Sequence, residues 1–143
     1  PNIEPKAIKK LIDYMNQDKC DIGTLASEFN TSSELQDKNV VKVLVKENMK
    51  QDIFVKALDF VRINPKKEYV AYHHIGIYAF TNKALLRYVS LNRSKLELER
   101  KLEQLRAMEN DMIVHVGFIK SSPLSVDTED DLIEVKKIME KNE

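Results

Sequence analysis

The sequence predicts an α/β fold in which a mixed sheet is flanked by helices. Segments with helical and with strand periodicity alternate along the chain, which is typical of α/β proteins. Of the 143 residues, 43% are hydrophobic and 32% are charged, as in globular chains and unlike disordered ones. A chain of this length can bury one core of its own, so residues 1–143 are expected to form a single domain or a fragment of one.

Composition excludes several classes of site. The chain has 23 Lys and Arg against 23 Asp and Glu, so its zero net charge gives no general attraction to nucleic acid or to an anionic membrane. One cysteine, Cys20, excludes an internal disulfide and a cysteine-based zinc site. The glycines Gly23, Gly76 and Gly117 lie too far apart to build a phosphate loop or a dinucleotide-binding motif. No apolar run approaches the ~20 residues that span a bilayer.

The first half of the chain is expected to contain one helix followed by strands. Apolar residues recur at helical spacing over 4–17, with lysines on the other face. Residues 20–29 are predicted to form a strand and 31–38 a polar turn. Residues 40–45 are β-branched and alternate, and 53–63 form a further strand candidate, so these two segments are expected to pair as a hairpin.

The second half opens with the clearest strand, residues 69–80. Because side chains alternate along a strand, one face carries Tyr72, His74, Gly76, Tyr78 and Phe80, and the other carries Ala71, His73, Ile75, Ile77 and Ala79. A helix is predicted over 82–89 and a strand over 112–119. Between them, Leu98, Leu102, Leu105 and Met108 have the spacing of one buried helical stripe. Thr128 is expected to open a final helix.

His74 and Tyr78 are the first candidates for a binding site. They share a face of the strand, and Gly76 lies between them without a side chain, which leaves a notch where an imidazole and a phenol could hold a ligand. The alternative is a sheet face packed by a helix, with Gly76 allowing close approach. His73 and His74 point to opposite faces, so they cannot bind one metal ion together.

For the other polar candidates, a purely structural role is again the alternative to a role in binding. Glu103 and Gln104 flank the leucine stripe and could simply form a solvated helix face. Asp127 precedes the final helix, where a carboxylate either caps the helix or binds Mg²⁺. Arg62 and Lys42 could meet anions, although isolated basic residues on strands are usually exposed.

Four segments, in order along the chain, resemble one enzyme family. His74–Phe80 is similar to the His-Ile-Gly-Ile-Tyr-Ala-Tyr strand of the 3-deoxy-manno-octulosonate cytidylyltransferases, the CMP-KDO synthetases. Lys101–Asn110 resembles their Lys-Leu-Glu-Gln-Leu-Arg-Ala-Leu-Glu-Asn helix, and Val126–Leu132 their Val-Asp-Thr-Pro-Glu-Asp-Leu segment. Asp37–Val43 looks like the strand that contains Asn-Val-Val-Lys-Val. The four segments are distributed over residues 37–132 of the chain.

The resemblance implies a nucleotide-diphospho-sugar transferase-like fold and a cytoplasmic reaction for lipopolysaccharide biosynthesis. The family couples 3-deoxy-manno-octulosonate (KDO) to CMP from CTP, with Mg²⁺, and releases pyrophosphate. Carried over by motif, the residues that would contact the sugar acid are His74, Tyr78, Glu103, Gln104 and Arg62. Asp127 would be one of two Mg²⁺-binding aspartates.

The chain also departs from the family pattern. The family begins with a strand and a basic, glycine-containing loop that holds CTP, followed by a metal aspartate in a Gln-Gly-Asp-Glu-Pro motif, and Pro1 aligns with the end of that motif. We therefore expect the chain to lack the N-terminal nucleotide-binding strands, to be inactive alone, and to form a homodimer or pair with the missing piece. Two alternatives stay open: a non-catalytic remnant that self-associates, and a cytidylyltransferase for a related sugar acid.

Overall fold

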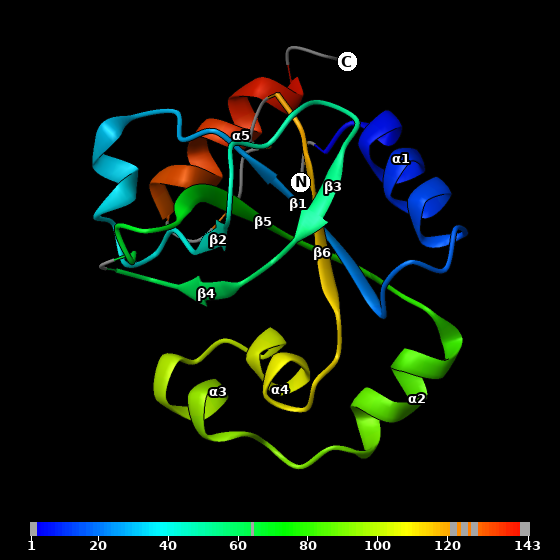
Figure 1. Ribbon diagram of the computed structural model, residues 1–143. Helices are drawn as coiled ribbons and strands as arrows, with labels where there is room; N and C mark the ends of the chain where they lie inside the picture. Colours follow the sequence, from blue (N-terminus) through cyan, green and yellow to red (C-terminus); the bar gives the residue numbers. More distant parts are fainter. Residues whose placement is uncertain (1–2, 64, 121–122, 124–125, 127–128, 141–143) are drawn as a thin grey trace.

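The computed structural model describes residues 3–63, 65–120, 123, 126 and 129–140, and it shows a mixed six-stranded sheet packed by helices (Figure 1). The helices are α1 (Pro5–Met15), η1 (Ser32–Leu35, a 3₁₀ turn), α2 (Asn82–Ser90), α3 (Lys95–Arg100), α4 (Gln104–Glu109) and α5 (Glu129–Glu140). The strands are β1 (Ile22–Ser27), β2 (Lys42–Val45), β3 (Phe54–Lys56), β4 (Asp59–Val61), β5 (Val70–Phe80) and β6 (Val114–Phe118). None of the described helices is long and apolar enough to cross a membrane.

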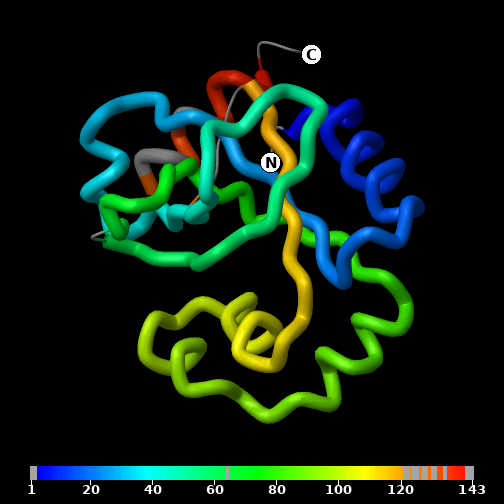
Figure 2. Tube along the Cα trace, viewed as in Figure 1, coloured from blue at the N-terminus to red at the C-terminus, as the bar shows by residue number. Residues whose placement is uncertain are grey.

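The sheet has the strand order β3-β6-β1-β5-β2-β4. β1 and β6 run parallel, and every other neighbouring pair is antiparallel, which confirms the predicted mixed sheet. After β5 the chain leaves the sheet, builds α2, α3 and α4 as one layer, and returns through β6 beside β1 (Figure 2).

Two apolar clusters cover the two faces of the sheet. The larger one joins β1, β2, β4, β5 and β6 to the α2–α4 layer and includes Ala26, Val43, Phe60, Ala84 and Leu105. The smaller one lies under α1, where Ala7 and Leu11 meet Leu25 and Ile75. The predicted alternation of β5 is confirmed, since Tyr72, Tyr78 and Phe80 join the first cluster and Ile75, Ile77 and Ala79 the second.

The segment 53–63 does not form one strand, which corrects the sequence prediction. β4 pairs with β2 as the expected hairpin, but β3 pairs with β6 at the opposite edge of the sheet. The break falls at Ala57 and Leu58, whose amides donate to Val114 on β6 and to Leu44 on β2. The sheet is therefore curled enough for consecutive residues to reach both edges.

The leucine stripe also divides into two short helices, α3 and α4. Lys101 separates them in the left-handed conformation, with φ 55° and ψ 49°. Leu98 is consequently 57% exposed on α3, whereas Leu102 and Leu105 are buried after the turn. The spacing of the leucines identified a buried segment, but it could not show the change of direction at Lys101.

An irregularity in β5 lies next to the candidate site. Thr24 on β1 pairs with Tyr78, but the next residue, Leu25, pairs with Ile75, so two extra residues are accommodated on β5. The Thr24 hydroxyl binds the carbonyl oxygens of Ile77 at 2.7 Å and Ile75 at 3.3 Å. Gly76, within this bulge, is exposed and has no atom within 4 Å of the position that a β-carbon would take.

We expect Gly117→Ala to lower the free energy of unfolding by about 1–3 kcal/mol, the usual cost of overpacking. A β-carbon at Gly117 would lie 2.5 Å from Cζ of Phe54, whose ring stacks on Tyr14 with centroids 3.9 Å apart. Urea unfolding measures the effect, and Gly76→Ala is the matched control because its β-carbon meets open space. Equal stabilities of the two variants would contradict the prediction.

Candidate functional site

The His74 imidazole lies on the face of β5 that packs against the α2–α4 layer. Its residue is only 7% exposed, and its ring meets Phe60 edge-on with centroids 4.9 Å apart. Nε2 lies 2.9 Å from Oγ1 of Thr24. Burial lowers the pKa of His74 to about 3, and the adjacent His73 adds to the shift, so the ring is neutral at physiological pH.

The hydrogen bonds of Thr24 assign the tautomer of His74. The single hydroxyl hydrogen of Thr24 is directed to the carbonyl oxygens of β5, so Oγ1 acts as acceptor toward His74. Nε2 of His74 then carries the proton and donates it to Thr24. Nδ1 is left with a free lone pair, and no described residue donates to it. His74 therefore presents an acceptor and no charge.

Tyr78 lies beside His74, with ring centroids 5.5 Å apart. Its hydroxyl has no hydrogen-bond partner among the described residues, so it is available to a ligand. Burial raises the pKa of Tyr78, and the nearby Tyr88 and Glu103 raise it further. The phenol is thus a firmly protonated donor next to a neutral acceptor.

Glu103 and Gln104 lie where α4 begins. Glu103 is exposed and acts electrostatically on Tyr78, while the Tyr88 hydroxyl donates to the Glu103 carbonyl at 3.2 Å. Gln104 is 8% exposed, so a solvated helix face is ruled out for Gln104. The structure therefore brings His74 and Tyr78 together on β5, and Tyr78 packs against the apolar cluster that contains Leu102, the neighbour of Glu103.

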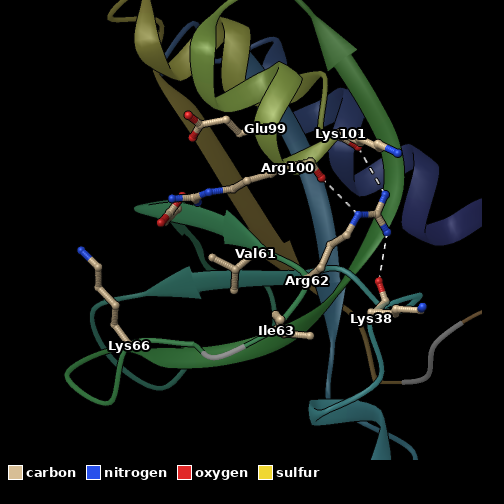
Figure 3. Close-up of a pocket in the computed structure, with 9 residues that line it drawn as sticks. Lys38, Val61, Arg62, Ile63, Lys66, Glu99, Arg100 and Lys101 are labelled. Carbon is tan, nitrogen blue, oxygen red and sulfur yellow. Dashed lines mark hydrogen bonds and ion pairs between the residues drawn. The ribbon is translucent and has the colours of Figure 1, made fainter.

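Arg62 lines a separate groove of about 500 Å³, formed between β4 and the end of α3 (Figure 3). The basic residues of this groove are Lys38, Arg62, Lys66, Arg100 and Lys101. Of its two acidic residues, Asp59 pairs with Arg100 at 2.7 Å and Glu99 lies 3.9 Å from Lys95, outside the groove. The groove is consequently positive, which suits an anionic group.

The Arg62 guanidinium is fixed by backbone oxygens rather than by a carboxylate. Nε donates to the carbonyl of Arg100 at 3.2 Å, Nη1 to Lys38 at 3.1 Å and Nη2 to Lys101 at 3.3 Å (Figure 3). Among the described residues, no carboxylate pairs with it. Its positive charge is therefore not neutralised locally.

Lys42 corrects the expectation that isolated basic residues on strands are exposed. It is 0% exposed, and Nζ donates to the carbonyls of Asp37 at 2.5 Å, Val40 at 2.7 Å and Arg62 at 2.6 Å. Desolvation lowers its pKa. Since all three of its protons are used, Lys42 holds the backbone on both sides of the groove and cannot bind a ligand.

The predicted Mg²⁺ ligand, Asp127, lies outside the described residues. Within the ranges that the structure describes, no three His, Cys, Asp or Glu side chains are grouped so that they could hold a metal ion. His115, the third histidine of the chain, has its Nδ1 2.7 Å from the Tyr14 hydroxyl beneath α1, on the other side of the sheet.

Sequence reasoning missed several polar residues near the site. Tyr88, Glu97, Arg100 and Arg106 form bonds to the site or to one another, but their spacing resembles an ordinary charged helix surface. The only indication that this region belongs to a site was the family resemblance around Glu103, and that resemblance implied no role for these four residues.

Acid should destabilise the protein through His74. The unfolded chain takes up a proton near the ordinary pKa of 6.5, whereas the folded chain resists until about pH 3, so the free energy of unfolding falls as the pH is lowered through this window. Between pH 6 and pH 4 the wild type should lose about 1.4 kcal/mol per pH unit more than His74→Gln. Urea unfolding at a series of pH values measures this, and points above pH 7.5 serve as the control. Parallel curves would show that His74 is not buried as a neutral ring.

Comparison with known proteins places the chain in a family. A family model described as Cytidylyltransferase matches residues 1–117. The chain is 42% identical over 142 residues to the 3-deoxy-manno-octulosonate cytidylyltransferase of Afipia carboxidovorans, covering 99% of this chain and 57% of that protein. It is 40% identical over 143 residues to the enzyme of the same name from Bartonella tribocorum, again over 57% of the relative.

A solved structure agrees with these relatives. The structure of CMP:2-keto-3-deoxy-manno-octonic acid synthetase complexed with CTP matches with a TM-score of 0.81 and 29% identity, over 99% of this chain and 58% of that chain. The chain thus spans somewhat more than half the length of the proteins it matches. On the family model and these matches, the chain belongs to the cytidylyltransferase family, in which its relatives are 3-deoxy-manno-octulosonate cytidylyltransferases.

Proposed function

We propose that this chain is the sugar-acid-binding part of a cytidylyltransferase that couples KDO to CMP from CTP. The observation that carries the proposal is geometric: His74 lies beside Tyr78, and Tyr78 packs against the cluster that contains Leu102 and Leu105, which flank Glu103 and Gln104. The family resemblance expects these polar residues to contact the sugar acid. An acceptor at His74 Nδ1 and a donor at the Tyr78 hydroxyl suit sugar hydroxyl groups, each of which both donates and accepts.

The positive groove would take the acidic half of the substrate, because Lys101 at its edge belongs to the same α3–α4 turn as Glu103. A sugar acid carries a carboxylate, and Arg62, with no carboxylate partner of its own among the described residues, offers a preorganised cation. Because the guanidinium is already held by three carbonyls, little side-chain entropy is lost when an anion binds. KDO is favoured over a neutral sugar for this reason.

In the proposed reaction the anomeric hydroxyl of KDO attacks the α-phosphate of CTP. A bond forms between the anomeric oxygen and that phosphorus, the bond to the β-phosphate oxygen breaks, and pyrophosphate leaves. Chemistry of this kind depends mainly on positioning and charge neutralisation. The residues of this chain would orient the sugar acid, and the hydroxyl proton would be released to solvent or to a base that the described residues do not identify.

Mg²⁺, when bound, would neutralise phosphate charge, with Asp127 as one ligand by resemblance. A single carboxylate is a weak Mg²⁺ site without substrate phosphates and further ligands. Because the chain matches 57% of its curated relatives and carries only three separated glycines, we propose that it does not turn over alone. It would act as a homodimer or with a nucleotide-binding partner segment, in the cytoplasm, in lipopolysaccharide biosynthesis.

A second candidate is a non-catalytic module that self-associates. It is favoured by the exposed apolar side chains of α2 and α3, Leu86, Val89 and Leu98, which an isolated domain gains nothing by exposing. Sedimentation at several concentrations, together with a KDO titration, separates the two: a dimer that binds no KDO supports the module.

KDO should bind the 143-residue chain, and Tyr78→Phe should weaken binding about three- to tenfold, because one hydrogen bond is lost. A titration followed by ¹H–¹⁵N spectra measures the dissociation constant. Tyr69→Phe, which removes a phenol hydroxyl from the segment before β5, is the control and should bind as the wild type does. An equal loss in both variants, or no binding by the wild type, would contradict the proposal.

Turnover is tested in a chimera. Residues 1–143 replace the matching 57% of the Afipia carboxidovorans relative, and the product is assayed with CTP, KDO and Mg²⁺. We expect formation of CMP-KDO with release of one pyrophosphate per product. A folded chimera that binds both substrates and yields no product would reject the catalytic role and leave the self-associating module.

A further inference from the structure

We infer that Tyr88 is a positioning residue that fixes the turn carrying Glu103 and Gln104 beside Tyr78, backed by the ion pair of Arg106 and Glu97. The inference rests on the proposed function, because it assigns a role in the binding of the sugar acid. Neither the family resemblance nor the relatives assign Tyr88, Arg106 or Glu97 a role.

The turn between α3 and α4 needs support of its own. Lys101 adopts the left-handed conformation there, which costs a non-glycine residue about 1 kcal/mol. Arg62 already binds the carbonyls of Arg100 and Lys101 from the groove side (Figure 3). The carbonyl of Glu103, two residues after Lys101, accepts from the Tyr88 hydroxyl at 3.2 Å. The turn is thus anchored by Arg62, which follows β4, and by Tyr88 of α2.

Tyr88 is itself held between β5 and α4. Its ring centroid lies 5.5 Å from that of Phe80 on β5, and the Arg106 guanidinium lies over the ring, 4.8 Å from its centroid. A cation over a phenol ring stabilises the ring in that orientation and makes the hydroxyl a better donor. The phenol therefore has little freedom to leave the Glu103 carbonyl.

Arg106 is fixed in turn by Glu97. The Glu97 carboxylate is 5% exposed and accepts from Nε of Arg106 at 2.8 Å and from Nη2 at 2.5 Å. It also accepts from the backbone amide of Ser94 at 3.1 Å, as part of the capping box of α3. A buried two-point ion pair with a third hydrogen bond is rigid, so α2, α3 and α4 are locked together around Glu103.

These contacts keep the turn that carries Glu103 close to Tyr78. Tyr78 and Tyr88 both pack against the apolar cluster that contains Leu102 and Leu105, the residues on either side of Glu103 and Gln104. If the Tyr88 hydroxyl is removed, the Glu103 carbonyl loses one hydrogen-bond donor, and the turn can shift away from Tyr78. The side chains of His74, Tyr78 and Glu103 themselves are unchanged. We therefore expect the dissociation constant of the sugar acid to rise, whereas the free energy of unfolding should change less.

The test is Tyr88→Phe in the 143-residue chain, with the ligand-free protein and the KDO complex measured separately. We expect the carbonyl ¹³C resonance of Glu103 to shift upfield in the free protein, and the KDO dissociation constant to rise about three- to tenfold, the effect of one hydrogen bond. Tyr14→Phe is the matched control, because it loses a phenol hydrogen bond of 2.7 Å to His115 under α1. It should bind KDO as the wild type does.

Arg106→Lys separates positioning from general packing, because it keeps the charge but loses the two-point bond to Glu97. It should weaken KDO binding, and the double variant with Tyr88→Phe should lose less than the sum of the two, since both act through one contact. An unchanged Glu103 carbonyl resonance in Tyr88→Phe, or an equal loss of affinity in Tyr14→Phe, would overturn the positioning role. Failure of the wild type to bind KDO would instead overturn the proposed function, while the carbonyl resonance still reports on Tyr88.

Discussion

The Thr24 hydroxyl lies between β1 and the bulge of β5, where it binds three groups. It accepts from His74 and bonds the carbonyl oxygens of Ile75 and Ile77, in a part of the sheet where the regular ladder is interrupted. Without this hydroxyl, buried carbonyls and a buried imidazole would lack partners, at a cost of about 1–3 kcal/mol for each group. The same contact sets the bulge that places Tyr78 beside His74, and it leaves the free lone pair of His74 on Nδ1. Local backbone geometry and the chemistry of the candidate site are therefore determined together.

Two buried or half-buried cations, Lys42 and Arg62, organise the rest of the site, and neither forms an ion pair with a residue that the structure describes. Lys42 binds three backbone carbonyls and Arg62 binds three more, and the two are linked because the Arg62 carbonyl is one of the acceptors of Lys42. Carbonyl oxygens satisfy the hydrogen-bonding needs of a cation but do not cancel its charge. The loop before β2, strand β4 and the end of α3 are thus held by groups that also keep the groove positive. The same side chains thus hold the backbone around the groove and contribute to its positive charge.

The sequence was sufficient for the parts of the fold that depend on local periodicity. β5, α1 and α2 were predicted closely, and so were the two faces of β5, because a regular strand or helix shows its buried face directly in the pattern. The secondary-structure predictions failed where contacts between distant segments determine the local backbone conformation. Ala57 and Leu58 divide a predicted strand because the curled sheet brings both of its edges to them, and Lys101 divides a predicted helix by one left-handed residue. Neither event leaves a signal in hydrophobic spacing.

For the candidate site, too, the sequence predicts what depends on local spacing but not what depends on tertiary contacts. Spacing alone could place His74 and Tyr78 on one face, but it could not bring the turn with Glu103 to them, since residues 79–102 and two helices intervene. Nor could it show that Lys42 is fully buried, because a lysine whose protons all meet carbonyls looks in the sequence like any exposed lysine. The α2–α4 segment acts as a cover for one face of β5, and its position is set from both ends of the α3–α4 turn, by Arg62 and by Tyr88. A ligand held between β5 and this cover would gain orientation from contacts that it never makes itself.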